Sequence, residues 1–206
     1  MIALRHLPSS EEPNNPPNGS QVKPNALQGW SYFGHHQFID FRENGLHLGI
    51  RPQEAINDYR SGEKIVLDGP VPDDFTAAVT IDFRGNQSAG DAGILFRTSS
   101  PSVGYNAQRG YFAGIIPRAQ IVILGMTDGS TWTELARIPA DIDSTLPQRL
   151  QVTCAGPKIT IQHNGKPALS HIGKTFPHGS LGLRVVDSHA IFSDVTITHP
   201  LVGQNR

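Results

Sequence analysis

The sequence contains few residues of several kinds, and each scarcity excludes a class of protein. A single cysteine, Cys154, excludes an intramolecular disulfide. No apolar run approaches the roughly 20 residues that cross a bilayer. Lys and Arg number 17 against 18 Asp and Glu, and they form no basic run. The sequence therefore predicts neither a membrane span nor a nucleic-acid partner.

The two ends of the chain differ in composition from its middle. The first residues, MIALRHLPSSEE, are too short and too soon acidic for a secretory signal, so we expect a cytoplasmic protein or one from which a leader was removed. Residues 8–27 carry five prolines and little that a core would bury. We expect a flexible proline-rich arm over 1–28, a β-sandwich domain over 29–199 and a tail over 200–206.

From Trp30 onward the chain consists of short alternating runs separated by turn residues. In DFTAAVTIDFR, apolar residues from Phe75 to Phe83 share one face and polar residues share the other, as in a strand with one buried side. The stretch RLQVTCAGPKITIQHNGK predicts a hairpin, in which Cys154 is interpreted as a small buried thiol. The residues expected to pair across its turn are Leu150, Val152, Cys154, Ile159 and Ile161.

Further turns and one irregularity are visible in the second half. Asp128-Gly129 predicts a turn between IVILGM and TWTELARI. In AIFSDVTIT the apolar residues fall out of phase by one, which predicts a bulge near Ser193 and Asp194. The only candidate for a helical turn is PQEAINDYR, residues 52–60. About a dozen strands exceed the mean for one sheet and predict two stacked sheets.

The run GDAGILFRT has apolar residues on both of its faces. The next run, GYFAGII, has the same property. Either loops cover the second face, or that face is a shallow concave floor where Gly93 and Gly114 leave room for a ligand. Alternation places on this second face Asp91, Gly93, Leu95 and Arg97.

The ordered series of these runs resembles the concanavalin A-like lectin/glucanase superfamily. The series comprises GWSYFGHHQFID, DFTAAVTIDFR, DAGILFRTSS, GYFAGII, IVILGM with TWTELARI, RLQVTCAGPKITIQHNGK and GSLGLRVVDSHAIFSDVTI. It is most similar to laminin-G-like modules attached to bacterial glycoside hydrolases and to domains of the 3-keto-disaccharide hydrolase type. The resemblance implies an all-β jelly-roll sandwich of two antiparallel sheets, with ligands on the concave sheet or its edge loops. The same fold hosts lectins, binding modules, glycanases and lyases.

Several catalytic patterns are missing from the sequence. The Glu-x-Asp-x-x-Glu motif that the superfamily's glucanases place on one strand is absent, and Asp141 and Asp143 fall in a predicted loop, PADIDSTLP. A Gly-x-Ser-x-Gly elbow is also absent. Adjacent strand residues point to opposite faces, so His35 and His36 do not ligate one metal from a regular strand. We expect no metal ligands, with calcium as the one open alternative through Asp73, Asp74, Asp187 or Asp194.

Sugars are recognised by aromatic stacking and by hydrogen bonds from planar charged groups, which defines the candidate ligand-binding residues. Arg97 is the first candidate, although structural pairing with a carboxylate fits it as well, and the same holds for Arg184. Trp132 is interpreted as a core or cross-strand aromatic. The full candidate set is Trp30, Tyr32, His35, Asp91, Arg97, Tyr105, Arg109 and Tyr111.

Three functions stay open at this point. The first is a non-catalytic, lectin-like domain that binds a carbohydrate or another small molecule. The second is an enzyme of the same fold, a hydrolase or lyase acting on a glycoside or other small molecule, with Asp91, His35 and Arg97 in unconventional roles. The third is an interaction domain for a protein partner.

Overall fold

The computed structural model describes residues 2–3, 28–35, 38–49, 62–85 and 90–199, and within them every regular element is a strand. None of these residues forms a helix that would cross a membrane. Of the arm expected over 1–28, the described residues are Gln28 and Ile2–Ala3, which form a short strand paired to residues 196–197. The rest of the arm and the candidate helical turn at 52–60 lie outside the described residues. The strands are β1 (Ile2–Ala3), β2 (Trp30–Phe33), β3 (Ile39–Arg42), β4 (Gly45–Gly49), β5 (Gly62–Leu67), β6 (Phe75–Asp82), β7 (Asp91–Ser99), β8 (Arg109–Ile116), β9 (Ile121–Asp128), β10 (Trp132–Pro139), β11 (Gln148–Ala155), β12 (Lys158–His163), β13 (Lys166–Ile172), β14 (Ser180–Val186) and β15 (His189–Thr198).

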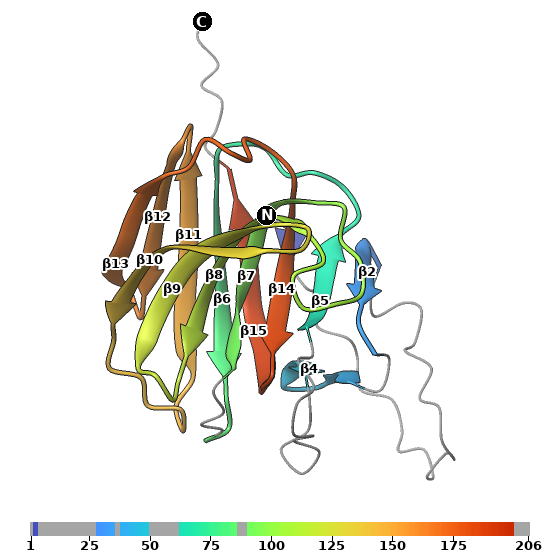
Figure 1. Cartoon of the computed structure of the whole chain (residues 1–206). Helices are drawn as coiled ribbons and strands as arrows, with labels where there is room; N and C mark the ends of the chain where they lie inside the picture. Colours follow the sequence, from blue (N-terminus) through green and yellow to red (C-terminus); the bar gives the residue numbers. More distant parts are fainter. Residues whose placement is uncertain (1, 4–27, 36–37, 50–61, 86–89, 200–206) are drawn as a thin grey trace, which may run out of the picture.

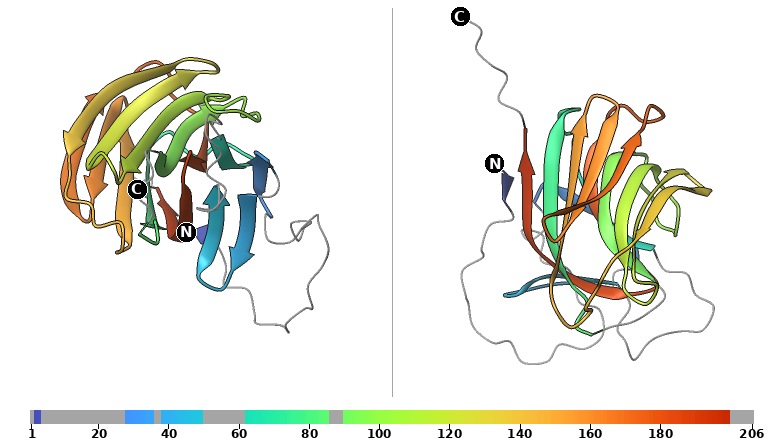
Figure 2. Two further views of the ribbon diagram at one scale, coloured as in Figure 1. Left: turned by 60° about the horizontal axis from the view of Figure 1, so that its bottom comes forward. Right: turned by 90° about the vertical axis from the view of Figure 1, so that its left-hand side faces the viewer.

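The strands form two antiparallel sheets that stack face to face, as predicted. Sheet A has the order β13-β12-β11-β6-β15-β4-β3, with β1 paired to β15. Sheet B has the order β10-β9-β8-β7-β14-β5-β2. Figure 1 shows sheet B in front of sheet A, and the right-hand view of Figure 2 shows the sheets as two layers. The architecture is a jelly-roll sandwich.

The predicted local features of sheet A are confirmed. In the hairpin of β11 and β12, Val152 lies opposite Ile161 and Cys154 opposite Ile159. Cys154 is buried, and burial raises the pKa of its thiol to about 11. In β15 the pairing with β6 shifts after Ser193, where Asp194 has a φ of 49°. This bulge returns the apolar residues after Asp194 to the inner face.

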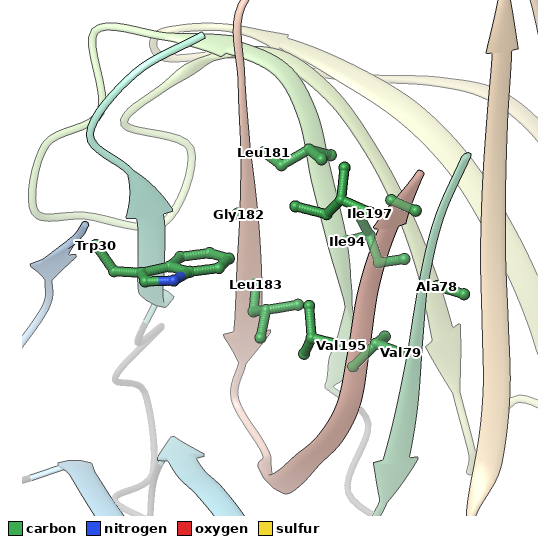
Figure 3. Close-up of a pocket in the computed structure, with 10 residues that line it drawn as sticks. Trp30, Ala78, Val79, Ile94, Leu181, Gly182, Leu183, Val195 and Ile197 are labelled. Atoms are coloured by element: carbon green, nitrogen blue, oxygen red, sulfur yellow. The ribbon is translucent and has the colours of Figure 1, made fainter. Parts of the chain in front are cut away.

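The main core lies between the two sheets. Every second residue of β6 and β11 points inward, and β7, β8, β9 and β14 contribute from the opposite layer. At the side where β14 faces β15, the packing leaves an apolar gap of about 10 Å³. Figure 3 shows Trp30 reaching from β2 toward Leu183, with Ile94 and Val195 across the gap. A space this small with an apolar lining stays dry.

We expect Leu183→Ala to destabilise the sandwich by about 2 to 5 kcal/mol, because the side chain is 2% exposed and its loss enlarges the existing gap. Urea unfolding followed by circular dichroism would measure the change. Ile172→Ala is the matched control, since Ile172 is 56% exposed and its truncation leaves no cavity. Equal losses in the two variants would contradict this account of the core.

Candidate functional site

One row of residues crosses the outer face of sheet B, the face turned away from sheet A. Register pairs place the members of the row on successive strands from β5 to β10. The two glycines at its centre leave the middle of the face without side chains of its own. Cationic residues occupy the β5, β14 and β10 positions. In strand order the row reads Lys64, Arg184, Gly93, Gly114, Ile123 and Arg137.

Arg184 is buried in this face, and 1% of the residue's surface is exposed. Its Nη2 donates to both carboxylate oxygens of Asp91, at 3.2 and 3.1 Å. Its guanidinium carbon lies 3.7 Å from the ring centroid of Phe112 and 5.6 Å from that of Trp132. The two aromatic rings meet edge to face at 6.2 Å. The side chains form a layer of guanidinium and aromatic rings across the sheet.

Glycines make this layer possible. A Cβ on Gly114 would collide with the ring of Phe112, and a Cβ on Gly125 would collide with the ring of Trp132. Gly93 also lies beneath the layer, in the row position beside Arg184. The space that Gly114 leaves is therefore filled by the chain's own aromatic ring, and the expectation of an open glycine floor is wrong at this position.

The open space lies next to the layer, toward the end of β7 that carries Asp91. It is a hollow of about 390 Å³, a size that suits a small ligand. Apolar side chains from β8 and β9 line its floor, and charged residues and two aromatics surround them. Its lining residues are Gly90, Asp91, Tyr105, Ile116, Ala119, Ile121, Ile123, Trp132, Glu134, Arg137, Arg184, Val186 and Asp187.

Two ion pairs line the hollow, Arg137 with Glu134 and Arg184 with Asp91. Glu134 accepts from Arg137 through Nε at 2.5 Å and also through Nη2. Burial raises the pKa of the Asp91 carboxyl, and the neighbouring Arg184 guanidinium opposes that shift. Within the described residues, Nε and Nη1 of Arg184 are buried without an acceptor. Such unpaired donors are rare in protein interiors and mark this guanidinium as unusual.

Comparison with known proteins identifies the architecture. No protein-family model matches the sequence. The levanase of Bacillus subtilis (strain 168) is 22% identical over 135 residues, which are 66% of this chain and 19% of that protein. The chain thus spans about a fifth of this relative's length.

Solved structures match over most of their length. The carbohydrate binding module CBM66 from Bacillus subtilis superposes with a TM-score of 0.68 at 19% identity, covering 82% of this chain and 94% of that one. A Bacillus subtilis protein of unknown function with a galectin-like fold gives 0.68 at 12% identity, over 86% and 92%. The VIP36 exoplasmic/lumenal domain in its Ca²⁺/Man3GlcNAc-bound form gives 0.63 at 15% identity, over 89% of each chain. The chain shares the concanavalin A-like jelly-roll fold of these structures. The fold that the resemblance implied is confirmed.

Within this concanavalin A-like sandwich, two of the eight candidate residues line the hollow, Asp91 and Tyr105. Arg97 does not share the face of Asp91, contrary to the expectation from alternation. A bulge after Phe96, with a φ of 48° at Arg97, shifts the strand by one residue. Arg97 Nη2 instead donates to the carbonyls of Asp73 at 3.0 Å and Gly156 at 2.6 Å. It joins β7 to the ends of two strands of sheet A.

The other candidates are spread over the sandwich. Trp30 and Tyr111 belong to the core between the sheets, where Tyr111 stacks on Phe96 at 5.4 Å. Tyr32 and the backbone N–H of His35 both donate to the buried Glu63 Oε2 near the β2 edge. Arg109 is exposed and lies against the carbonyl of Asp128 and the ring of Phe176. His35, Asp91 and Arg97, named for an enzyme, therefore occupy three separate places.

The hollow also contains residues that the sequence did not single out as a group. Trp132, Glu134 and Arg137 come from β10, whereas Arg184 and Asp187 come from β14 and the residue after it. The sequence favours a core or cross-strand role for Trp132 and leaves Arg184 open between ligand contact and pairing with a carboxylate. A signal was present in the glycine-rich runs GDAGILF and GYFAGII, which indicated a face needing partners from elsewhere in the chain. It did not indicate which strands supply them.

Candidate metal ligands do not gather in the described part of the chain, where no group of three or more His, Cys, Asp or Glu side chains could hold an ion. Of the four carboxylates considered for calcium, Asp187 lines the hollow. Asp74 accepts from the backbone N–H of Gly156 at 2.6 Å, on the other sheet. Asp141 and Asp143 are exposed in the loop between β10 and β11, as predicted.

We expect Gly125→Ala to displace the Trp132 ring and to destabilise the protein by about 1 to 3 kcal/mol, because the new methyl group overlaps the ring. A shift of the tryptophan fluorescence maximum together with thermal unfolding would detect both effects. Gly69→Ala is the control, since a Cβ at Gly69 meets nothing within 4 Å. If both variants unfold at the same temperature, Gly125 does not serve the packing of Trp132.

Proposed function

We propose that this chain binds a neutral carbohydrate in the hollow and does not hydrolyse it. The observation that carries the proposal is the meeting of Trp132, Arg184 and Asp91 around a hollow of about 390 Å³. The apolar face of a sugar ring packs on aromatic side chains, and its hydroxyls bond to carboxylate and guanidinium groups. The isoleucines of the floor add apolar contact. The hollow offers both kinds of interaction.

The charges favour a neutral saccharide over an acidic one. Three carboxylates line the hollow, those of Asp91, Glu134 and Asp187, against the guanidinium groups of Arg137 and Arg184. Both guanidinium groups are already paired with carboxylates. A uronic acid or sulfated sugar would meet surplus negative charge, because each arginine of the lining already has a carboxylate partner and the carboxylates outnumber the arginines. Hydroxyl groups, which donate and accept, fit this lining better.

The similar structures support a carbohydrate ligand. One is described as a carbohydrate binding module and another was solved in a Man3GlcNAc-bound form. At 19% and 15% identity these proteins share the fold with this chain. The ligand of this chain has to be inferred from the residues of its own hollow. Because one relative is a levanase, levan is among the sugars to be tested.

An enzyme is the second candidate, because the hollow contains more than one carboxylate. A glycoside hydrolase uses two carboxyl groups, one of them a proton donor, and burial raises the pKa of Asp91 in the direction that suits a donor. Arg184 and Arg137, however, already engage Asp91 and Glu134. Carboxylates held in such pairs are poorly placed to exchange protons with a substrate, which favours binding without hydrolysis.

Isothermal titration against a panel of neutral polysaccharides, namely levan, inulin, laminarin, galactan and mannan, tests the proposal. We expect at least one to bind and polygalacturonate, the acidic comparison, to give no heat. Trp132→Ala should weaken the binding about tenfold or more through loss of the stacking surface. Arg109→Ala is the matched control, because Arg109 is exposed and lies outside the hollow, and we expect unchanged affinity.

Three outcomes would contradict the proposal in different ways. Absence of heat with every saccharide would reject sugar binding. Release of reducing sugar that disappears in Asp91→Asn, with the fold intact, would favour the enzyme. A stable protein partner that is insensitive to all sugars would favour an interaction domain. Titrations with calcium present and with calcium chelated should agree, because Asp91 and Glu134 are already paired with arginines.

A further inference from the structure

Lys64 is a buried lysine whose position needs an explanation. It lies on β5, is 0% exposed, and stands opposite Arg184 in the register. Burial and the neighbouring Arg184 guanidinium lower the pKa of Lys64 to about 8, and Glu63, on the same strand, opposes the shift. An ammonium beside a second cation is unfavourable unless other groups compensate. The function proposed above assigns no role to this residue.

The compensation comes from the loop that joins β7 to β8, residues 100–108. Lys64 Nζ donates to the backbone carbonyls of Ser102 and Gly104, both at 2.8 Å. The loop is closed on itself by a bond from the Ser102 N–H to the Ala107 carbonyl at 2.7 Å. In Figure 1 this green loop runs in front of β14 and β5. A single side chain thus fastens a loop to the sheet beneath it.

The fastened segment carries one wall of the hollow. Tyr105 follows Gly104 directly, and it is the only residue of this loop in the described lining of the hollow. Gly62, two residues before Lys64, packs closely on the loop, since a Cβ there would lie 2.7 Å from Cα of Tyr105 and 2.8 Å from the carbonyl oxygen of Gly104. The hydrogen bonds of Lys64 hold the loop against the sheet, and the missing side chain at Gly62 allows the loop backbone to lie this close to β5. Both contacts keep the backbone at Gly104 and Tyr105 close to β5.

We propose that Lys64 is a positioning residue, whose buried ammonium holds loop 100–108 against β5 and thereby places Tyr105 in the wall of the sugar-binding hollow. The inference rests on the proposed function, because it assigns a role within that same site. Lys64 itself lies outside the lining of the hollow and acts through the loop. Binding to a preformed wall avoids the free-energy cost of ordering the loop and its side chains with each ligand.

The test compares Lys64→Met with the wild type. The apolar side chain of similar length fills the same volume but donates no hydrogen bonds. We expect faster hydrogen exchange at the amides of residues 102–107, with β8 and β9 still protected. For the polysaccharide of the panel that binds the wild type best, we expect affinity about tenfold lower, mainly through faster dissociation. Lys158→Met, which removes an exposed lysine from sheet A, is the control and should change neither measurement.

Gly62→Ala provides a second, independent perturbation, because it pushes on the same loop while Lys64 stays in place. It should produce the same two effects, and it keeps the test decisive if Lys64→Met does not fold. Unchanged exchange in the loop of both variants would overturn the anchoring role, whether or not sugars bind. Looser loops with unchanged sugar affinity would overturn the positioning role alone. If the wild type binds no polysaccharide, the proposed function fails and the positioning role fails with it.

Discussion

The outer face of sheet B depends on one buried cation, the guanidinium of Arg184. A buried charge needs partners, and here they come from three directions. Asp91 contacts Nη2, the ring of Phe112 lies beneath the guanidinium, and the ring of Trp132 lies at its side. These partners come from β7, β8 and β10. The contacts of the Arg184 side chain therefore link three other strands across the outer face of the sheet.

Two glycines of this face make room for aromatic side chains of the chain itself and not for a ligand. Flat side chains can lie across a sheet only where the strands beneath carry no Cβ. Gly114 and Gly125 meet this condition under Phe112 and Trp132. The layer they permit covers the middle of the face, so the open space is displaced toward Asp91 and the ends of β8 and β9. These glycines therefore mark the part of the face that is covered by aromatic rings, and the hollow lies next to it.

Local sequence patterns predicted hairpins and bulges well. The composition of the hollow depends on long-range strand pairing, which the sequence does not reveal. Alternation and turn residues gave the β11–β12 hairpin, and a change of phase gave the bulge at Asp194. Arg97 was misplaced because its bulge needs a positive φ at a residue that rarely adopts one. The hollow was beyond sequence alone, since β14 inserts between β5 and β7 from more than 80 residues away. Only that insertion brings Arg184 to Asp91.

The two buried arginines among the described residues, Arg97 and Arg184, differ in the kind of partner that holds them. Arg97 Nη2 bonds to two backbone carbonyls at the ends of sheet A strands, and Arg97 does not line the hollow. Arg184 Nη2 bonds to a side chain, and the guanidinium stacks on a ring instead of on backbone. Backbone partners fix an arginine as part of the fold, because they are present in any sequence that adopts it. Side-chain partners are specific to this sequence, and two of them, Asp91 and Trp132, line the hollow together with Arg184. That contrast, more than burial or residue type, is why Arg184 and not Arg97 belongs to the proposed sugar site.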